Sequence, residues 1–360
     1  MRLVPASARA LGDRRLSGRR RALAGVAAAV AGLTVVAGCK VPGMSNGAAA
    51  PTVTGTINVG AAPGIGDVPL YLANHYGAFH RAGVTVNIVS YPSLKAELRD
   101  LQSGKIQVAF GDYADMFYAQ AQAQAAGGKN ALNMVILADG YDAAPNTMEV
   151  LTLPNSNIVT PKNLQGKLIG TTAPQLMPTS TPGQPYSLET VATQTVLQNE
   201  NVDLSHVHWL ALSTGPSLIS ALASHRVNAI LATEPTIFEA ESQLGAVPVL
   251  DSATGATANL PLGGYFALRS FAGKDHALLT AFRSALEEGQ ADASQQAPVR
   301  SALQGSVGMS VADASLVTLG QYPTSTNASD LQRVVSQMFV FNAIGSVGGN
   351  QLSVQNMIFH

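Results

Sequence analysis

The sequence predicts an α/β protein composed of two similar lobes, and three observations support this. The chain has 360 residues, which is long enough for two domains or for one two-lobed fold with substantial cores. Residues 106–110 form a nearly continuous apolar run, as expected for a strand of a parallel sheet that is covered on both faces. The unit that contains this strand also occurs twice, at residues 103–115 and 224–236.

The two copies of this unit match at a constant offset. Each reads as a helix end, a basic turn, a strand, a polar turn and a new helix. Upstream, after a slip of three positions, both copies contain Pro-Ser-Leu, at residues 92–94 and 216–218. The alternative is two unrelated βαβ units that share only the general pattern of buried strands and amphipathic helices. The matched pairs are Lys105 with Arg226, Ile106 with Val227, Gln107 with Asn228, Phe110 with Leu231 and Phe117 with Phe238.

Charge is distributed unevenly along the chain. The first 38 residues carry seven Arg and one Asp, whereas residues 39–360 carry 14 basic and 21 acidic residues. An acidic body without a basic cluster argues against binding to nucleic acid. Cys39 is the single cysteine, so no disulfide can form within the chain.

The N-terminus is typical of an exported lipoprotein. An Arg-rich segment precedes an apolar run at residues 22–37, which is short for a membrane span and suits a signal peptide. The run ends in Val36-Ala37-Gly38-Cys39, which resembles the bacterial lipobox. That resemblance implies a signal peptide at residues 1–38 and a diacylglycerol on Cys39; the alternative is an ordinary buried cysteine. The Arg residues fit a twin-arginine signal only loosely, so the export route stays open.

Residues 39–55 comprise the lipidated cysteine and a flexible tether. Residues 40–54 are mostly Gly, Ala, Pro, Ser and Asn, with little to bury. About 15 such residues reach roughly 20 Å at random-coil scaling. We therefore expect an extracytoplasmic protein, anchored by its lipid to the outer face of the cell membrane.

The first lobe is predicted from alternating strand and helix patterns. Gly64-Ile65-Gly66 suggests a dinucleotide-binding loop, but Pro69 replaces the third glycine and no acidic ribose partner follows, so no cofactor is predicted. Asp112 follows a strand, where it can cap the next helix or face a ligand at the sheet edge. The expected strands are residues 56–61, 84–89, 106–110 and 134–138, with helices at 69–80, at 94–101 and from 113 to about 126.

The second lobe is predicted in the same way. Ser187 opens a helix, either as a simple cap or as part of a polar-ligand site. His206 and His208 share a strand face without a nearby carboxylate, so no metal is predicted. Residues 149–153 and 263–268 are the expected crossing strands. The other expected elements of this lobe are strands ending at 172 and at 207–212, 227–231 and 247–250, and helices at 188–199, starting within 213–217, and from 235. The helices expected near 276–291, 311–319 and 331–344 follow the second crossing strand and are predicted to pack on the first lobe.

A series of loose motifs resembles one known family. After the lipobox and the first strand comes Pro-Leu-Tyr-Leu-Ala at residues 69–73. This order resembles the extracytoplasmic solute-binding proteins of ABC transporters in the nitrate, sulfonate, taurine and thiamine-pyrimidine-precursor family. The further segments are residues 76–79 (Tyr-Gly-Ala-Phe), 82–86 (Ala-Gly-Val-Thr-Val), 101–110, 164–170 (Leu-Gln-Gly-Lys-Leu-Ile-Gly) and 232–235 (Ala-Thr-Glu-Pro).

The resemblance implies a two-lobed periplasmic-binding-protein fold of the type II kind, with two crossing hinge strands. Lobe 1 would comprise residues 56–153 and 255–360, and lobe 2 residues 154–254. The partners implied are a small-molecule solute and the permease and ATPase subunits of an ABC importer, with the binding protein itself a monomer. The site residues implied are Gly66, Asp67, Gly111, Asp112, Tyr113, Thr171, Thr172, Ser187 and Glu234, with Asp139 and Tyr141 near the hinge.

The implied site loops carry no Arg or Lys. Their carboxylates are acceptors and their tyrosines offer aromatic faces, which favours a solute with amino groups or a nitrogen heterocycle. A helix N-terminus can bind an anion without a basic side chain, so a sulfonate or nitrate-type solute is the alternative. A sensor or scaffold of the same fold is a further alternative. An enzyme is disfavoured because no His lies in a motif with a carboxylate and a nucleophile.

Overall fold

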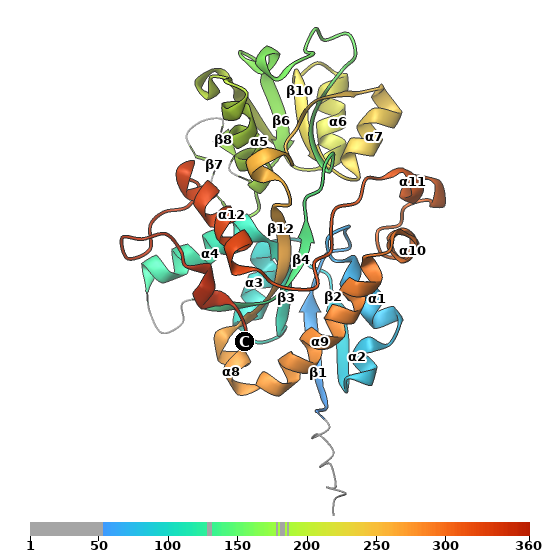
Figure 1. Cartoon of the computed structure of the whole chain (residues 1–360), viewed down its shortest axis with the longest axis vertical. Helices are drawn as coiled ribbons and strands as arrows, with labels where there is room; N and C mark the ends of the chain where they lie inside the picture. The colour runs from blue at the N-terminus through green and yellow to red at the C-terminus, as the bar shows by residue number, and fades with distance from the viewer. Residues whose placement is uncertain (1–52, 128–131, 178, 181–183, 186) are drawn as a thin grey trace, which may run out of the picture. The chain divides into compact units, whose positions relative to one another are not determined.

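The computed structural model describes residues 53–127, 132–177, 179–180, 184–185 and 187–360. The predicted signal peptide and Cys39 lie outside these residues. Two five-stranded mixed sheets organise the described chain (Figure 1). The first sheet has the order β2-β1-β3-β12-β4, in which β1 pairs in parallel with β2 and β3, and β12 runs antiparallel to both β3 and β4. Its strands are β1 (Gly55–Gly60), β2 (Val84–Val89), β3 (Val108–Asp112), β4 (Met134–Asp142) and β12 (Pro261–Leu268).

The second sheet repeats this arrangement. Read from β9 its order is β9-β6-β10-β5-β11, with β6 parallel to β9 and β10, and β5 antiparallel to β10 and β11. Each sheet thus has three parallel strands followed by one reversed strand. Its strands are β5 (Met148–Thr152), β6 (Leu168–Thr172), β9 (His208–Leu212), β10 (Ala229–Thr233) and β11 (Val247–Asp251), and a small ribbon pairs β7 (Thr179–Ser180) with β8 (Gln184–Pro185).

The helices follow the predicted pattern with shifted ends. The helix expected at residues 69–80 is divided in two, because Gly77 takes a left-handed conformation with φ of 72°. The helices are α1 (Val68–His75), α2 (Ala78–Arg81), α3 (Leu94–Gln102), α4 (Tyr113–Ala126), α5 (Leu188–Asn199), α6 (Gly215–Ala223), α7 (Thr236–Leu244), α8 (Arg269–Lys274), α9 (His276–Ala293), α10 (Gln296–Ser306), α11 (Val311–Leu316) and α12 (Ala328–Val340). Short 3-10 turns lie at η1 (Pro161–Leu164), η2 (Leu204–His206), η3 (Gly255–Thr257) and η4 (Val354–Met357).

The duplicated unit keeps one offset from its first helix to its strand. At the offset that aligns Lys105 with Arg226, the bounds of α3 coincide with those of α6, and the bounds of β3 with those of β10. The same offset places Ser93 on Thr214, and each caps its helix by accepting a hydrogen bond from a backbone N–H. The slip proposed from the two Pro-Ser-Leu segments is therefore wrong, because Ser217 lies inside α6 rather than at its cap.

The matched pair Gln107 and Asn228 performs one task in both sheets. The Gln107 side-chain oxygen accepts from the Asn58 N–H of β1 at 2.9 Å, and the Asn228 side-chain oxygen accepts from the Leu168 N–H of β6 at 2.9 Å. In return, each matched residue donates its own N–H to the carbonyl of the same partner. An amide side chain at this turn thus closes the start of each parallel strand pair.

We expect Gln107→Ala and Asn228→Ala to destabilise the chain by similar amounts. Each change leaves one strand N–H without its protein acceptor, which costs about 1 kcal/mol at such partly exposed positions. Equilibrium denaturant unfolding measures both values. The exposed Gln198→Ala serves as a control for loss of an amide; a large effect in one copy and none in the other would contradict the shared role.

The chain passes between the two sheets twice. Both passages lie next to strands rather than in them, at residues 143–147 and 252–260. They are hydrogen-bonded to each other, because Ala143 N–H donates to the Leu260 carbonyl at 2.9 Å. Of the segments expected to cross, residues 149–152 belong to β5 and residues 263–268 to β12, while Leu153 directly follows β5. An apolar run predicts a buried strand, but it does not show which sheet the strand joins.

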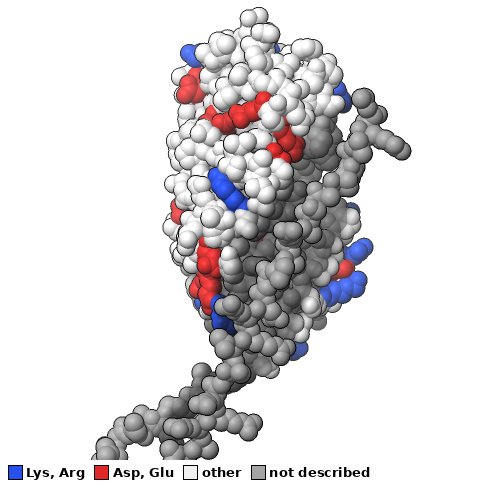
Figure 2. All heavy atoms as spheres, turned by 90° about the vertical axis from the view of Figure 1, so that its right-hand side faces the viewer, with Lys and Arg blue, Asp and Glu red and all other residues white. Residues whose placement is uncertain are grey.

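Side chains from both sheets share one hydrophobic core. It includes Met116 and Phe117 of α4, Leu188 and Val191 of α5, and Leu331 of α12. Within the described residues, no helix has the length and apolar character needed to cross a membrane. On the face shown in Figure 2 the described surface is mostly uncharged, and its basic groups lie in separate small patches.

Candidate functional site

The predicted site residues lie where strands of the two sheets end. This is the edge at which open α/β sheets hold their ligands. Gly66 and Asp67 follow β1; Gly111 and Asp112 end β3, and Tyr113 opens α4; Asp139 and Tyr141 lie in β4; Thr171 and Thr172 end β6; Ser187 precedes α5; Glu234 follows β10.

Asp67 lies just before α1 with its side chain fully buried, at 0% exposure. One oxygen, Oδ1, accepts a hydrogen bond from the Gly64 N–H at 3.0 Å. The other, Oδ2, is buried and has no hydrogen-bond partner among the described residues. Burial raises the pKa of Asp67 to about 7, because removing the carboxylate from water disfavours its charged form.

Glu97 of α3 lies at the same edge. It is 5% exposed, and its Oε1 also has no partner among the described residues. A Cβ at Gly60, the last residue of β1, would stand 2.5 Å from this oxygen, so the carboxyl lies directly over the strand end. Burial raises the pKa of Glu97 to about 8; the backbone of Phe110 opposes this rise, and the Asp67 carboxylate adds to it. The two carboxyls are therefore near enough to repel each other.

Phe110 fits against a surface of three glycines. A Cβ at Gly66, Gly140 or Gly263 would lie 3.1, 2.6 or 3.2 Å from an atom of its ring. The ring also contacts the buried Tyr265, with centroids 4.9 Å apart. Phe110 itself is only partly buried. Glycine at these three positions leaves room for the Phe110 ring next to the backbone.

Tyr113 and Asp139 form an enclosed pair. The Tyr113 hydroxyl donates to Asp139 Oδ1 at 2.9 Å, and the Gly140 N–H donates to the same oxygen at 3.0 Å. Tyr113 is 0% exposed, and its ring stacks on Phe117 at 5.3 Å. Burial raises the pKa of Asp139. We expected Tyr113 to offer an aromatic face, but this ring lies in the core and supports the sheet edge through Asp139.

Tyr141 and Tyr322 fix the loop after β1. The Tyr141 hydroxyl accepts from the Gly320 N–H at 2.7 Å, and its ring lies 5.2 Å from that of Tyr322. The Tyr322 hydroxyl donates to the carbonyl of Ile65 at 2.9 Å. Tyr322, which was not predicted, thus anchors the loop that carries Asp67 to the C-terminal part of the chain.

Asp112 caps α4, as predicted. Its Oδ1 accepts from the N–H groups of Ala114 and Asp115 at 2.8 and 3.1 Å. Burial raises its pKa, and the Glu189 carboxylate of α5 contributes to the rise. A Cβ at the neighbouring Gly111 would stand 2.9 Å from the end of the Met116 side chain, which would then have to shift. Asp112 therefore caps α4, and its carboxylate is also influenced by the negative charge of Glu189 in the second lobe.

The candidate site residues of the second sheet and its helix α5 mainly carry hydroxyl groups. Thr171 is buried, whereas Thr172 is exposed at the end of β6. Ser187 caps α5 by accepting from the Thr190 N–H at 3.3 Å, and its own N–H donates to the Thr190 hydroxyl at 2.8 Å. Ser187 is thus held in a reciprocal capping box.

Glu234 connects the two lobes. Its Oε1 accepts from the Thr318 N–H at 2.8 Å, and its Oε2 accepts from the Phe238 N–H at 3.1 Å. Thr318 follows α11, far from Glu234 in sequence. Burial raises the pKa of Glu234, while these two N–H groups oppose the rise. Both oxygens of this predicted solute acceptor are thus engaged by backbone groups.

Asp115 makes a second connection between the lobes, which the sequence analysis did not identify. From α4, its Oδ1 accepts from the N–H groups of Leu176 and Met177 at 2.9 and 3.2 Å, and its Oδ2 from that of Gln175 at 3.2 Å. These three residues follow β6 in the second sheet. The Gln175 side chain also accepts from the Leu94 N–H at 2.8 Å.

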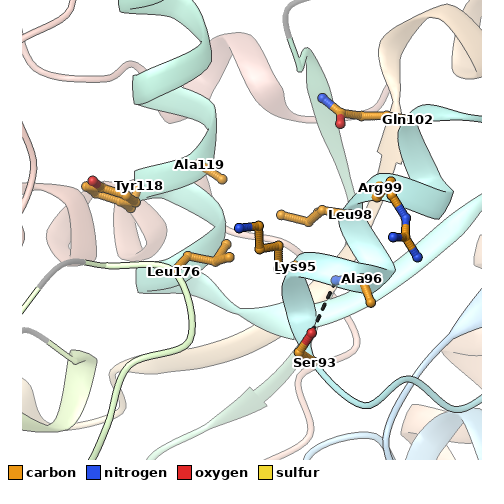
Figure 3. Close-up of a pocket in the computed structure, with 9 residues that line it drawn as sticks. All are labelled: Ser93, Lys95, Ala96, Leu98, Arg99, Gln102, Tyr118, Ala119 and Leu176. Carbon is orange, nitrogen blue, oxygen red and sulfur yellow. Dashed lines mark hydrogen bonds between the residues drawn. The ribbon is translucent and has the colours of Figure 1, made fainter.

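A separate groove of about 570 Å³ lies between α3 and α4 (Figure 3). Lys95 points into it between Leu98 on one side and Leu176 on the other, and Arg99 lies at its rim. Lys95 and Arg99 are both exposed. The groove therefore offers solvated positive charge, in contrast to the buried carboxyls at the sheet edge.

The positions of Glu97 and Asp115 in the sequence could have identified them as candidate functional residues. Glu97 stands three residues after Leu94 and four before Leu101, so it lies on the apolar face of its helix. A charged residue on a buried face needs a partner or a function. Asp115 is an acidic residue in the first turn of a helix that Asp112 already caps, which leaves its carboxylate free for another partner.

Solved structures with the same fold include binding proteins and an enzyme. One of them is the periplasmic aliphatic sulphonate binding protein SsuA from Escherichia coli, which is 17% identical to this chain. The match covers 84% of this chain and 97% of SsuA, with a TM-score of 0.66. The nitrate-binding protein NrtA from Synechocystis PCC 6803 is 12% identical over 81% and 83%, with a TM-score of 0.62. The desulfurization enzyme DSZB is 15% identical over 84% and 96%, with a TM-score of 0.60.

The two matched sheets, the two chain passages and these neighbours define the class: the chain has the periplasmic-binding-protein fold. A family model described as "NMT1/THI5 like" matches residues 67–299. The chain belongs to the NMT1/THI5-like family. The resemblance stated from its motifs is therefore confirmed. No curated protein matches the chain.

Proposed function

We propose that the protein is the solute-binding component of an ABC importer. It captures a small polar solute with amino groups or a nitrogen heterocycle between its lobes and delivers that solute to a membrane permease and its ATPase. The family and the fold support solute capture. The solute class is supported by the chemistry of the sheet edge, where the buried side chains Asp67, Glu97 and Asp139 are acceptors. The binding protein acts as a monomer in this proposal.

One observation carries the proposal: the lobes are joined by carboxylate-to-backbone hydrogen bonds at two places, Asp115 and Glu234. When the lobes separate, both partners of each bond reach water, so opening costs less than the loss of one partner inside the closed form. A solute that contacts both lobes then stabilises the closed form by its differential contacts. The closed form is the species that docks on the permease.

A ligand screen that also reports lobe closure tests this function. The full chain in detergent is screened by thermal shift against amines, pyrimidines, purine-like compounds, sulfonates and nitrate. A ligand that binds the folded state raises the unfolding midpoint. The same ligand should slow hydrogen exchange at the amides of Gln175, Leu176 and Met177, since these amides bond Asp115 only when the lobes are together.

Two results would contradict the proposal. A compound that raises the midpoint without protecting residues 175–177 binds outside a closing cleft. If no compound of the panel raises the unfolding midpoint, a sensor or scaffold of the same fold is favoured. Asp115→Asn provides the control for the exchange measurement, because it should increase exchange at these amides even without ligand.

An anionic solute is the main alternative. Two structural neighbours are a sulphonate-binding and a nitrate-binding protein, and Lys95 and Arg99 line the groove of Figure 3. Both cations are exposed, which weakens their attraction for an anion through solvent screening. Tight binding of a sulfonate, lost in Lys95→Ala, would favour this alternative.

Catalysis is a less favoured alternative, which the neighbour DSZB keeps open. A Gly-x-Ser-x-Gly match occurs at residues 43–47, in the predicted tether rather than at a strand-to-helix turn. Within the described residues, no group of His, Cys, Asp and Glu is arranged to hold a metal ion. The proposal therefore assigns the chain no catalytic residue.

We propose further that the mature protein is anchored outside the cytoplasm by a lipid on Cys39. In bacteria fed a palmitate analogue, the native chain should incorporate label and sediment with membranes. Cys39→Ser should abolish labelling and release the chain or leave it unprocessed, because the thiol that accepts the diacylglycerol is lost. Ser45→Ala is the matched control in the same tether. Equal labelling of the native chain and Cys39→Ser would contradict the lipobox assignment.

A further inference from the structure

We propose that Asp67 and Glu97 together form the subsite that takes a protonated nitrogen of the solute. This inference rests on the proposed function and specifies which group of the solute is recognised and by which residues. It makes Glu97, a residue outside the predicted site, a determinant of specificity.

The first argument is the pair of unsatisfied oxygens. Asp67 Oδ2 and Glu97 Oε1 are both buried and both lack a hydrogen-bond partner among the described residues. The side chains are 0% and 5% exposed, so water does not replace the missing partners freely. Buried polar atoms are nearly always paired, and those that are not commonly await a ligand, an ion or water.

The second argument is the absence of a counter-charge. None of the ion pairs among the described residues includes Asp67 or Glu97. Two carboxyls held together without a cation disfavour their own ionised forms. The Asp67 carboxylate contributes to raised pKa values of three tyrosine hydroxyls, those of Tyr71, Tyr265 and Tyr322, and none of these groups carries a positive charge. A cation on the solute supplies the charge that the protein leaves out.

The third argument is the shape of the strand end. Gly60 leaves room for the Glu97 carboxyl, because any Cβ there would collide with it. Phe110 lies at the end of the adjacent strand β3, with a partly exposed ring. The buried Tyr265 ring contacts the Phe110 ring, with centroids 4.9 Å apart, and its hydroxyl has no hydrogen-bond partner among the described residues. An aromatic face beside an acidic pair suits an ammonium on an aromatic or heterocyclic body.

Three probes of one shape test the subsite: benzylammonium, benzyl alcohol and benzenesulfonate. The full chain in detergent should show a rise in unfolding midpoint with benzylammonium only. Glu97→Gln and Asp67→Asn should each weaken that binding by about tenfold or more, the value of one charge-assisted hydrogen bond. Glu200→Gln, which removes an exposed carboxylate at the end of α5, should leave it unchanged.

Three results would overturn the subsite: a response to benzenesulfonate without one to benzylammonium, an equal benzylammonium response in the native chain and both variants, or no response to any probe. Failure of the proposed function is recognised separately. If benzylammonium binding depends on Glu97 but does not slow exchange at residues 175–177, the subsite stands and capture by lobe closure fails. If another solute slows that exchange equally in Glu97→Gln, capture stands and the subsite fails.

Discussion

Asp115→Ala should lower the free energy of unfolding by about 3 kcal/mol, the order expected when several backbone N–H groups lose one charged acceptor. Three consecutive N–H groups, those of Gln175, Leu176 and Met177, donate to this carboxylate. Asp115 is 6% exposed, so the N–H groups are left in a poorly hydrated place. Denaturant unfolding measures the loss, and hydrogen exchange at residues 175–177 shows where it occurs.

Asp330→Ala is the matched control for this prediction. Asp330 also lies in the first turn of a helix, α12. Its negative charge interacts favourably with the helix dipole, as that of Asp115 does in α4. Asp330 is partly exposed and pairs with Arg333 at 3.7 Å, and no N–H of the second lobe donates to it among the residues that the structure describes. We expect its replacement to cost well under 1 kcal/mol. Equal losses in both variants would show that Asp115 acts through the helix alone.

The stability of the ligand-free chain should fall as pH rises from about 5 to about 8. In the unfolded chain the carboxyls of Asp67 and Glu97 titrate near their ordinary pKa values of 3.8 and 4.5, whereas burial raises them to about 7 and about 8 in the fold. Between these values the folded chain holds protons that the unfolded chain has released, so raising the pH favours unfolding. One such group changes the unfolding free energy by about 1.4 kcal/mol per pH unit.

Glu97→Gln should remove much of this pH dependence. An uncharged amide of the same shape needs no proton to stay buried, so the variant should exceed the native chain in stability by about 2 kcal/mol or more at pH 8 and match it near pH 5. Unfolding curves at several pH values measure the difference. The control Glu200→Gln, which removes an exposed carboxylate, should leave the dependence of stability on pH unchanged. If Glu97→Gln also leaves that dependence unchanged, the Glu97 carboxyl is ionised in the folded chain at little cost, which contradicts the prediction.

These two predictions concern different halves of the proposed mechanism. Asp115 holds the lobes together through backbone groups and should alter closure without changing which solute is chosen. Glu97 lies at the edge of the first sheet and should alter the choice of solute without changing the contact at residues 175–177. Measuring closure and affinity in both variants therefore separates movement from recognition.

The sequence by itself determined the α/β class, the duplication and most elements, because buried strands and amphipathic helices leave short-range patterns. The pairing of Gln107 with Asn228 is an example, since both close a parallel strand pair in the way their shared position predicts. The capping role of Asp112 followed from the same local reasoning. Helix ends and the slip at Ser217 were misjudged, because several nearby residues can cap equally well in the sequence.

Only the tertiary structure decided which acidic residues are free. Glu234 and Asp67 both follow strands and read alike in the sequence, but Thr318 and Phe238 occupy both oxygens of Glu234, whereas one oxygen of Asp67 is left unpartnered. The passages between the sheets at residues 143–147 and 252–260 could not be predicted from the sequence either. The physical reason is the same in each case: a hydrogen-bond partner or a neighbouring strand can come from any part of the chain, and local pattern carries no information about it.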